Sequence, residues 1–179
     1  LNLLPVFNNH PLKEVIIHPR TARQMYAGTV DLETFEKVLA GCRHPVIYNG
    51  DILTRNHFAA LTNRFAGVTG WMMGRGVLAD PFLPADIKKI HICEENSRID
   101  IIKNFHDDLF SGYGRILSGP AHLGDRMKGL WRYLAPSFEN GDKILKAINK
   151  TNQTQQYRET VNRFFQAGAK WSPHGSQAH

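Results

Sequence analysis

Three short apolar runs without polar alternation mark the first half of the chain: residues 15–17, 46–48 and 70–73. Unalternating runs of this length are typical of strands buried on both faces of a parallel sheet. Helical patterns follow Asp31 and Thr54, which are predicted to be N-caps. The intervals from residue 15 to 46 and from 46 to 70 each have the length of one βα unit, which predicts an α/β architecture.

The strand pattern stops after Pro81, and apolar residues then recur at helical spacing. Helices are predicted after Ser97 and around residues 123–134, 144–148 and 157–164. We therefore expect an α/β domain over residues 1–90, a helical bundle over 91–171, with the junction near 82–92, and a flexible tail at 172–179. Residues 1–8 are expected to be the end of a helix whose start is missing.

The composition is that of an ordinary globular protein, with 42% hydrophobic and 21% charged residues among 179. No apolar run approaches the length of a membrane-spanning helix. The first residues contain neither an initiator Met nor a basic segment, so we expect a fragment of a longer protein rather than a signal peptide. Cys42 and Cys93 match no zinc or redox spacing and are expected to be buried structural thiols in a reducing, cytoplasmic compartment.

The net charge of +6 is unevenly distributed. Residues 1–110 contain 12 Lys or Arg against 12 Asp or Glu, whereas residues 111–171 contain 10 against 4. A neutral part joined to a basic part favours two functions, the second directed at a polyanion. Solvated basic helices without a partner explain the same distribution equally well.

Polar motifs directly follow each predicted strand. They contain His18 and Arg20, then Asn49, Gly50 and Asp51, then Gly74 and Arg75. Ligands of parallel βα folds bind at the carboxyl ends of the strands. Glycine and a following helix N-terminus favour a phosphate, to which Arg75 would add a charge-assisted contact. The alternative is that these are simply tight βα turns.

The motif after the first strand contains two arginines, Arg20 and Arg23. They suit an anionic cofactor, RNA phosphates, or pairing with Asp51, and the sequence leaves these alternatives open.

Residues 17–28, 46–52 and 72–81 together resemble the successive signatures of tRNA-dihydrouridine synthases, and residues 117–134 are similar to the helical domain of that family. The resemblance covers about residues 1–167. It implies strands six to eight of a flavin mononucleotide (FMN)-binding TIM (β/α)8 barrel, followed by a helical bundle.

The resemblance also implies roles for particular residues. His18 would contact the flavin, and its phosphate would be held by Asn49, Gly50 and Asp51 with Gly74 and Arg75. In this family NADPH reduces FMN, which reduces specific uridines of tRNA to 5,6-dihydrouridine while a cysteine protonates the base. The family's cysteine and a flavin-binding lysine precede the matched part, so no catalytic residue is expected in this chain.

The basic helical part would bind tRNA. Besides Arg20 and Arg23, the cations expected to contact RNA are Arg115, Arg126, Lys128 and Arg132. They surround Tyr113, Trp131 and Tyr133, which either stack on an unpaired base or belong to the helical core.

Two alternative functions remain open: a tRNA-binding module without catalysis, and another FMN-dependent barrel oxidoreductase acting on a small molecule. The missing half-barrel, or another chain that completes it, is an expected partner.

Overall fold

The computed structural model describes residues 2–94 and 97–173. The chain forms two compact units, Leu1–Val77 and Leu78–His179. The division falls earlier than the expected boundary near residue 90. Most of the tail that is expected to be flexible, residues 174–179, lies outside the described residues.

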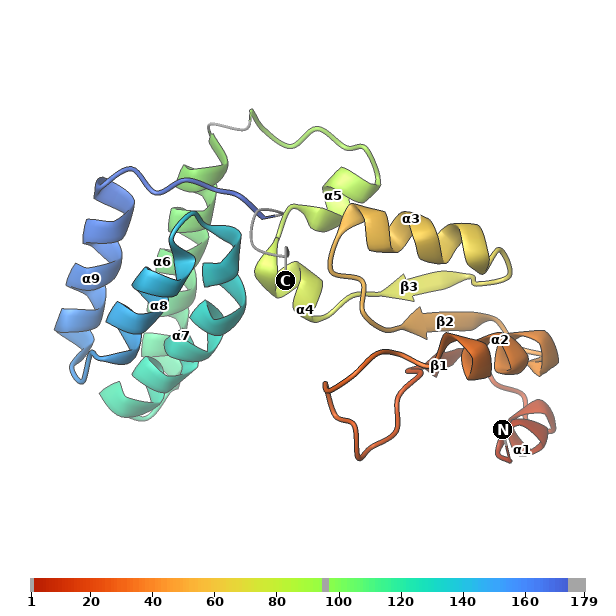
Figure 1. Ribbon diagram of the computed structural model, residues 1–179. Coiled ribbons are helices and arrows are strands. Elements are labelled where there is room, and N and C mark those ends of the chain that lie inside the picture. Colours follow the sequence, from red (N-terminus) through yellow and green to blue (C-terminus); the bar gives the residue numbers. More distant parts are fainter. Residues whose placement is uncertain (1, 95–96, 174–179) are drawn as a thin grey trace. The chain divides into compact units, whose positions relative to one another are not determined.

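Unit 1 alternates short helices with parallel strands (Figure 1). Its elements are α1 (Leu4–Asn8), β1 (Val15–Ile17), α2 (Leu32–Gly41), β2 (Val46–Asn49), α3 (Arg55–Arg64) and β3 (Gly70–Met72), followed by the start of α4 (Arg75–Ala79). The three predicted strands are therefore confirmed. Both predicted caps are confirmed as well, because Asp31 accepts from the Thr34 N–H at 2.9 Å and Thr54 accepts from the His57 N–H at 3.1 Å.

The sheet has the strand order β1-β2-β3, and both pairings are parallel. Ile17 lies opposite Tyr48, and Asn49 lies opposite Met72. The three strands point the same way, so the loops that follow them emerge from one edge of the sheet (Figure 1). This common edge positions the polar motifs predicted from the sequence.

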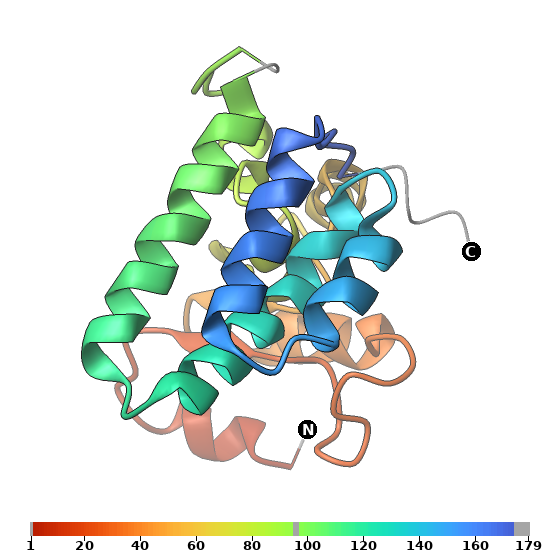
Figure 2. The ribbon, with the colours of Figure 1, turned by 90° about the vertical axis from the view of Figure 1, so that its left-hand side faces the viewer.

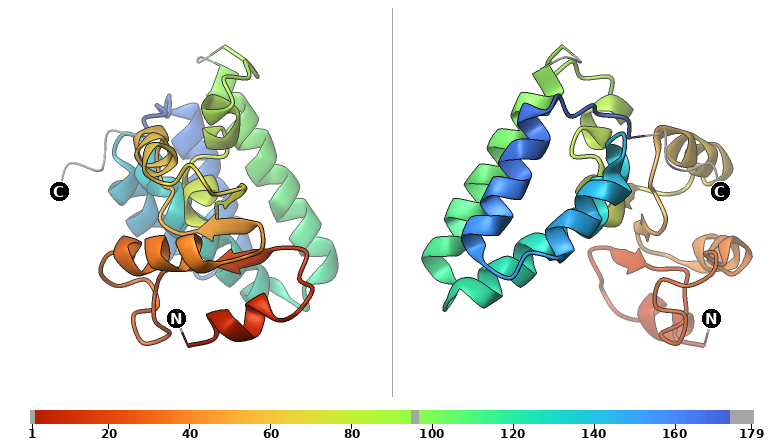
Figure 3. Two further views of the ribbon diagram at one scale, coloured as in Figure 1. Left: turned by 90° about the vertical axis from the view of Figure 1, so that its right-hand side faces the viewer. Right: turned by 60° about the vertical axis from the view of Figure 1, so that its left-hand side comes forward.

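The two faces of the sheet differ. On one face Tyr48 packs edge-on against Phe35 of α2, with ring centroids 4.9 Å apart, and Trp71 packs against Phe58 of α3 at 5.4 Å. The other face presents Ile16 and Met72, which are 47% and 39% exposed. Among the described residues, β1 and β3 pair only with β2, so the outer edges of both strands are open. The left panel of Figure 3 views this unit from the side of α2 and α3.

Unit 2 is built mainly from helices (Figure 2). After α5 (Leu83–Ile87) it contains α6 (Arg98–Ile116), α7 (Pro120–Leu134), the 3-10 turn η2 (Ala135–Ser137), α8 (Gly141–Asn149) and α9 (Thr154–Gln166). Helix α7 contacts α6, α8 and α9 and carries four buried residues: Leu123, Met127, Trp131 and Leu134. A one-sided apolar stripe of this kind drives helix packing more than intrinsic propensity does.

A buried polar network crosses the core of unit 2. Tyr157 of α9 donates to Nε2 of His106 at 2.6 Å and accepts from the Trp131 indole N–H at 2.9 Å. The Nδ1–H of His106 donates a hydrogen bond to the Asp107 carboxylate at 3.0 Å. Burial lowers the pKa of His106, although Asp107 raises it. The imidazole is therefore held neutral with its proton on Nδ1.

Two contacts explain why residues just after β3 belong to unit 2. The Ser137 hydroxyl donates to the Ala79 carbonyl at 2.7 Å, and Arg98 pairs with Asp86 at 2.8 Å. Helix α6 begins after Ser97 as predicted, but Ser97 makes no side-chain cap hydrogen bond.

Candidate functional site

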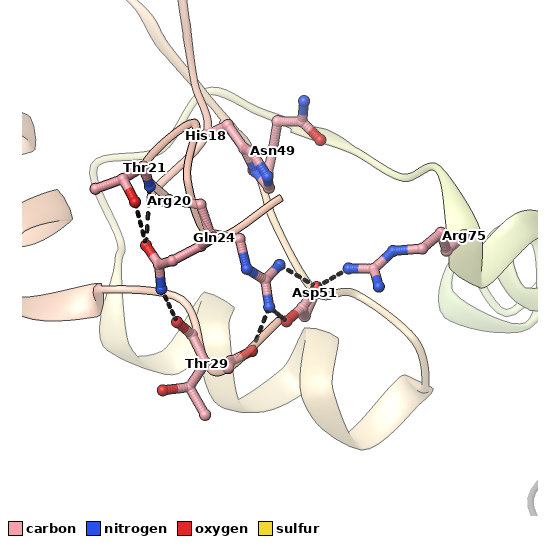
Figure 4. Close-up of polar contacts among 9 residues, drawn as sticks. His18, Arg20, Thr21, Gln24, Thr29, Asn49, Asp51 and Arg75 are labelled. Carbon is pink, nitrogen blue, oxygen red and sulfur yellow. Dashed lines mark hydrogen bonds and ion pairs between the residues drawn. The ribbon is translucent and has the colours of Figure 1, made fainter. Parts of the chain in front are cut away.

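The loops after β2 and β3 lie side by side, as the sequence predicted. Strand pairing brings Asn49 opposite Met72, and the Arg75 guanidinium lies 2.5 Å from a carboxylate oxygen of Asp51. Figure 4 shows this edge of the sheet, with Arg20 and Arg75 approaching Asp51 from opposite sides. The motifs from three strands thus form one cluster.

Asp51 is the centre of the cluster. Arg20 donates to both of its carboxylate oxygens, at 2.8 and 2.6 Å, and also to the Gly28 carbonyl at 2.7 Å. The side chain of Arg20 is only 2% exposed, whereas those of Asp51 and Arg75 are 24% and 28% exposed. Two guanidinium groups around one carboxylate leave a net charge of +1 at the edge.

The hydrogen bonds from Arg20 hold the pKa of Asp51 below its usual value, against the opposing effect of burial. The positive charges of Arg20 and Arg75 lower this pKa further. Asp51 in turn raises the pKa of Arg20. Asp51 and Arg20 are therefore both ionised at neutral pH, as a fixed ion pair.

For Arg20, the structure shows one of the three alternatives left open: its guanidinium pairs with Asp51, and the side chain is buried. Arg23, by contrast, lies exposed in the loop between β1 and α2.

The same loop is braced by Gln24. Its side-chain oxygen accepts from the Thr21 N–H at 2.9 Å, and its amide donates to the Thr29 carbonyl at 3.4 Å (Figure 4). The loop also places the Tyr26 ring against Arg75, with the guanidinium carbon 4.3 Å from the ring centroid. This cation–π contact was not predicted from the sequence, because it joins the tip of one loop to the start of a helix two strands away.

His18 lies at the same edge. Its Nδ1 hydrogen-bonds to the backbone carbonyl of Asn49, so Nδ1 carries the proton. The side chain is exposed, and Nε2 remains as the ring nitrogen that can meet a ligand. His18 directly follows β1 and Asn49 is the last residue of the neighbouring strand β2, which explains their proximity.

The two glycines of the edge have different surroundings. A Cβ on Gly50 would clash with the Tyr48 hydroxyl oxygen, whereas a Cβ on Gly74 would meet nothing within 4 Å. Gly50 is therefore required by packing against Tyr48, and only Gly74 borders open space. Helix α4 has five residues, too short for the helix N-terminus expected from the sequence to contribute much to anion binding.

This geometry fits a phosphate group. Arg75 is held by one ion pair and one ring, and its side chain is 28% exposed. Guanidinium groups form strong charge-assisted hydrogen bonds with phosphate oxygens.

The basic residues of unit 2 differ in their freedom. Arg126 lies over the Tyr113 ring at 5.7 Å, and Arg115 and Arg132 are exposed. Lys128 donates to the Thr151 carbonyl at 2.6 Å and is thereby held against its own unit. Trp131 is completely buried, which confirms the core alternative for this residue.

A groove of about 770 Å³ lies in unit 2 between α6 and α7. Leu109 and Leu130 supply apolar walls, Tyr113 and Tyr133 add flat aromatic surfaces, and Arg126 stands among the polar lining residues. The sequence places these tyrosines near the basic residues but gives no signal for the groove, which depends on how two helices pack.

Cys42 and Cys93 are both free thiols, as expected, but they are partly rather than completely buried. Cys42 caps the end of α2, before β2 begins. Within the described ranges, no helix is both long and apolar enough to cross a membrane.

Comparison with known proteins agrees with the geometry. The family model described as "Dihydrouridine synthase (Dus)" matches residues 6–172. A probable tRNA-dihydrouridine synthase of Rickettsia conorii is 26% identical over 175 residues, covering 91% of this chain and 50% of the relative. The human protein named tRNA-dihydrouridine(47) synthase [NAD(P)(+)]-like is 34% identical over 108 residues, covering 58% of this chain and 16% of the relative.

A third relative, a probable tRNA-dihydrouridine synthase of Mycobacterium tuberculosis, is 38% identical over 74 residues, covering 41% of this chain and 19% of its own length. The chain spans about half the length of the first Rickettsia relative. Because the family model extends over nearly the whole chain, from before β1 to beyond α9, the chain belongs to the dihydrouridine synthase family.

Proposed function

We propose that this chain forms the phosphate-binding edge and the RNA-binding unit of a tRNA-dihydrouridine synthase, which reduces uridine in tRNA to 5,6-dihydrouridine with FMN and NADPH. The observation that carries the proposal is the cluster at Asp51, where two arginines from different loops meet at the carboxyl ends of parallel strands. The family match supports the same reaction.

The residues present fit a flavin phosphate. Arg75 would bind the phosphate beside Gly74, and Asn49, Gly50 and Asp51 would form the adjoining loop. His18 would meet the flavin through Nε2, with its ring oriented by the Asn49 carbonyl. FMN, when bound, supplies the hydride chemistry, and this chain binds and orients it.

The exposed face of the sheet fits the interior of a barrel. Ile16 and Met72 are apolar yet exposed, and the outer edges of β1 and β3 are open among the described residues. Open parallel edges are uncommon in isolated folds, because they leave backbone groups unpaired. We infer that β1–β3 are strands six to eight of a TIM barrel, whose remaining strands cover this face.

The helical unit would bind tRNA. Arg115, Arg126 and Arg132 are exposed cations on or next to α6 and α7, and the neighbouring groove has aromatic walls that suit an unpaired base. Arg23 is a further candidate on the loop after β1. Lys128 is the weaker candidate, because Thr151 already binds its ammonium group.

A turnover measurement on the whole protein tests the proposal. Purified protein should show flavin absorbance and, with NADPH and unmodified tRNA, should convert uridine to dihydrouridine, detected as a gain of two hydrogens by mass spectrometry of nucleosides. Colourless protein that still binds tRNA would favour the non-catalytic RNA-binding alternative. Flavin reduction with no change in tRNA would favour an oxidoreductase acting on a small molecule.

Arg126→Gln tests the helical unit separately. We expect the affinity for tRNA to fall. The slope of log affinity against log salt concentration should become shallower by about 0.7–0.9, because binding with one phosphate contact fewer releases fewer counterions from the RNA. The control is Lys146→Gln on α8, an exposed cation that pairs only loosely with Asp142 at 3.7 Å. Equal salt slopes for both variants and wild type would contradict the assignment of Arg126.

A further inference from the structure

Arg20 is held more tightly than a structural ion pair requires. Its guanidinium makes three hydrogen bonds: two to the carboxylate of Asp51 and one to the Gly28 carbonyl. These contacts join the end of β1, the end of β2 and the far side of the loop before α2. Because the group is nearly fully buried, solvent cannot substitute for any of them.

Stability alone explains this arrangement poorly. Burying an ion pair costs desolvation energy that its attraction often does not recover, so a buried pair is weak evidence for stabilisation. The Nε atom of Arg20 is also buried without a hydrogen-bond partner among the described residues, and this adds to the free-energy cost of burying the side chain. The advantage of arginine at position 20 therefore lies more in the rigid, planar arrangement of its N–H donors than in its charge.

The fixed geometry is passed on to Arg75. One oxygen of Asp51 accepts from both Arg20 and Arg75, so the position of the carboxylate determines where the Arg75 guanidinium lies. The Tyr26 ring supports Arg75 from another side, and the loop that carries Tyr26 is itself bonded to Arg20 through Gly28. Both supports of Arg75 therefore depend on Arg20.

We propose that Arg20 is the positioning residue of the phosphate site: it fixes Asp51 and the loop of Tyr26, and through them aims Arg75 at the flavin phosphate. Asp51 then acts as a bridge between two cations and not as a phosphate ligand, since its negative charge would repel the phosphate. The inference rests on the proposed flavin function and adds a buried residue that does not touch the ligand.

The test compares FMN with riboflavin, which lacks the phosphate. In the whole protein we measure both dissociation constants by flavin fluorescence, for wild type and for Arg20→Lys. Lysine keeps the charge but cannot form the bidentate contact. We expect the preference for FMN over riboflavin to fall about tenfold or more, the scale of one charge-assisted hydrogen bond, with little change in riboflavin affinity.

Arg64→Lys is the matched control. Arg64 pairs with Glu36 at 3.0 Å on the surface, where the two side chains are 40% and 57% exposed, and its replacement should leave the preference unchanged. Equal losses of FMN and riboflavin affinity in Arg20→Lys would indicate a purely structural role and overturn the inference, as would an unchanged preference. A wild-type protein without any preference for FMN would instead contradict the proposed function.

A double-mutant cycle with Asp51→Asn tests whether Arg20 acts through the carboxylate. Once the Asp51 charge is removed, Arg20→Lys should lower the FMN preference by much less than it does in wild type. Additive effects of the two substitutions would mean that Arg20 acts independently of Asp51, which contradicts the proposal.

Discussion

Gly50 and Gly74 show how the same residue serves two purposes in one site. Tyr48, whose pKa burial raises to about 12, occupies the space where a side chain on Gly50 would lie. Gly74 faces open space instead. The sequence treats both as phosphate-loop glycines, and only the packed structure separates the structural glycine from the one that faces a ligand.

We expect Gly50→Ala to destabilise the protein by ~1–3 kcal/mol, because the added methyl group overpacks a buried ring. Gly74→Ala should leave the unfolding free energy nearly unchanged but weaken FMN binding, since its Cβ would enter the space proposed for the phosphate. Urea denaturation and FMN titration of both variants check this pair. A stable Gly50→Ala protein, or full FMN affinity in Gly74→Ala, would contradict the assignments.

His106 makes the stability of the helical unit depend on pH. Its folded pKa lies below the unfolded value of about 6.5, so the unfolded chain binds more protons and stability falls as pH drops through and below that value. Denaturation midpoints measured from pH 7.5 to 5.5 should therefore decrease. His106→Gln should flatten the decrease, whereas an equal slope in both proteins would show that other groups cause it.

The sequence allowed most of the residues that meet at the sheet edge to be predicted. His18, Asp51 and Arg75 follow strands and Asn49 ends one, and the rule that parallel strands end at one edge brings them together. Tyr26 could not be predicted, because no local pattern indicates that a loop tip will reach Arg75. The pairing of Arg20 with Asp51 was one of several alternatives left open by the sequence, and it is the one seen in the structure.

Helix starts show which local signals are reliable. Thr54 accepts a backbone hydrogen bond at the start of α3, whereas Ser97 makes no such bond at the start of α6. The sequence predicted the starts of both helices correctly, but of the two expected N-cap hydrogen bonds only that of Thr54 forms. A serine that precedes a helix need not adopt the extended backbone that a capping residue requires. Ser97 has helical backbone angles instead.

Thr54→Ala should therefore destabilise the protein by about 1 kcal/mol, the usual value of a lost N-cap. Ser97→Ala should have almost no effect, and it serves as the matched control. Thermal unfolding followed by circular dichroism measures both. A similar loss in the two variants would mean that the cap bond of Thr54 contributes nothing specific.

Elements were easier to predict than their assembly. Apolar runs give β1–β3, and apolar stripes give α6–α9, because strands and helices bury residues at different periods. The groove between α6 and α7 and the central place of α7 arise from packing between elements, for which the sequence contains no periodic signal.

The whole chain combines an α/β unit with a helical one, each with a net charge of +3: 8 Lys or Arg against 5 Asp or Glu in Leu1–Val77, and 14 against 11 in Leu78–His179. Both units match one family. The α/β unit presents an apolar sheet face and two open edges among its described residues, which fits a part of a barrel that other strands complete. The excess of basic residues after residue 110 predicted a second function directed at a polyanion, but the identification of that polyanion as RNA depended on the family resemblance.

We propose that Arg75 and Gly74, with Arg75 held in place by Asp51, bind the phosphate of FMN. A crystal structure of the whole protein with FMN would show this contact. We expect a phosphate oxygen at hydrogen-bonding distance, about 2.7–3.2 Å, from the Arg75 guanidinium, with Asp51 still bonded to Arg20. A phosphate bound elsewhere, with Arg75 engaged only by Asp51 and Tyr26, would contradict it.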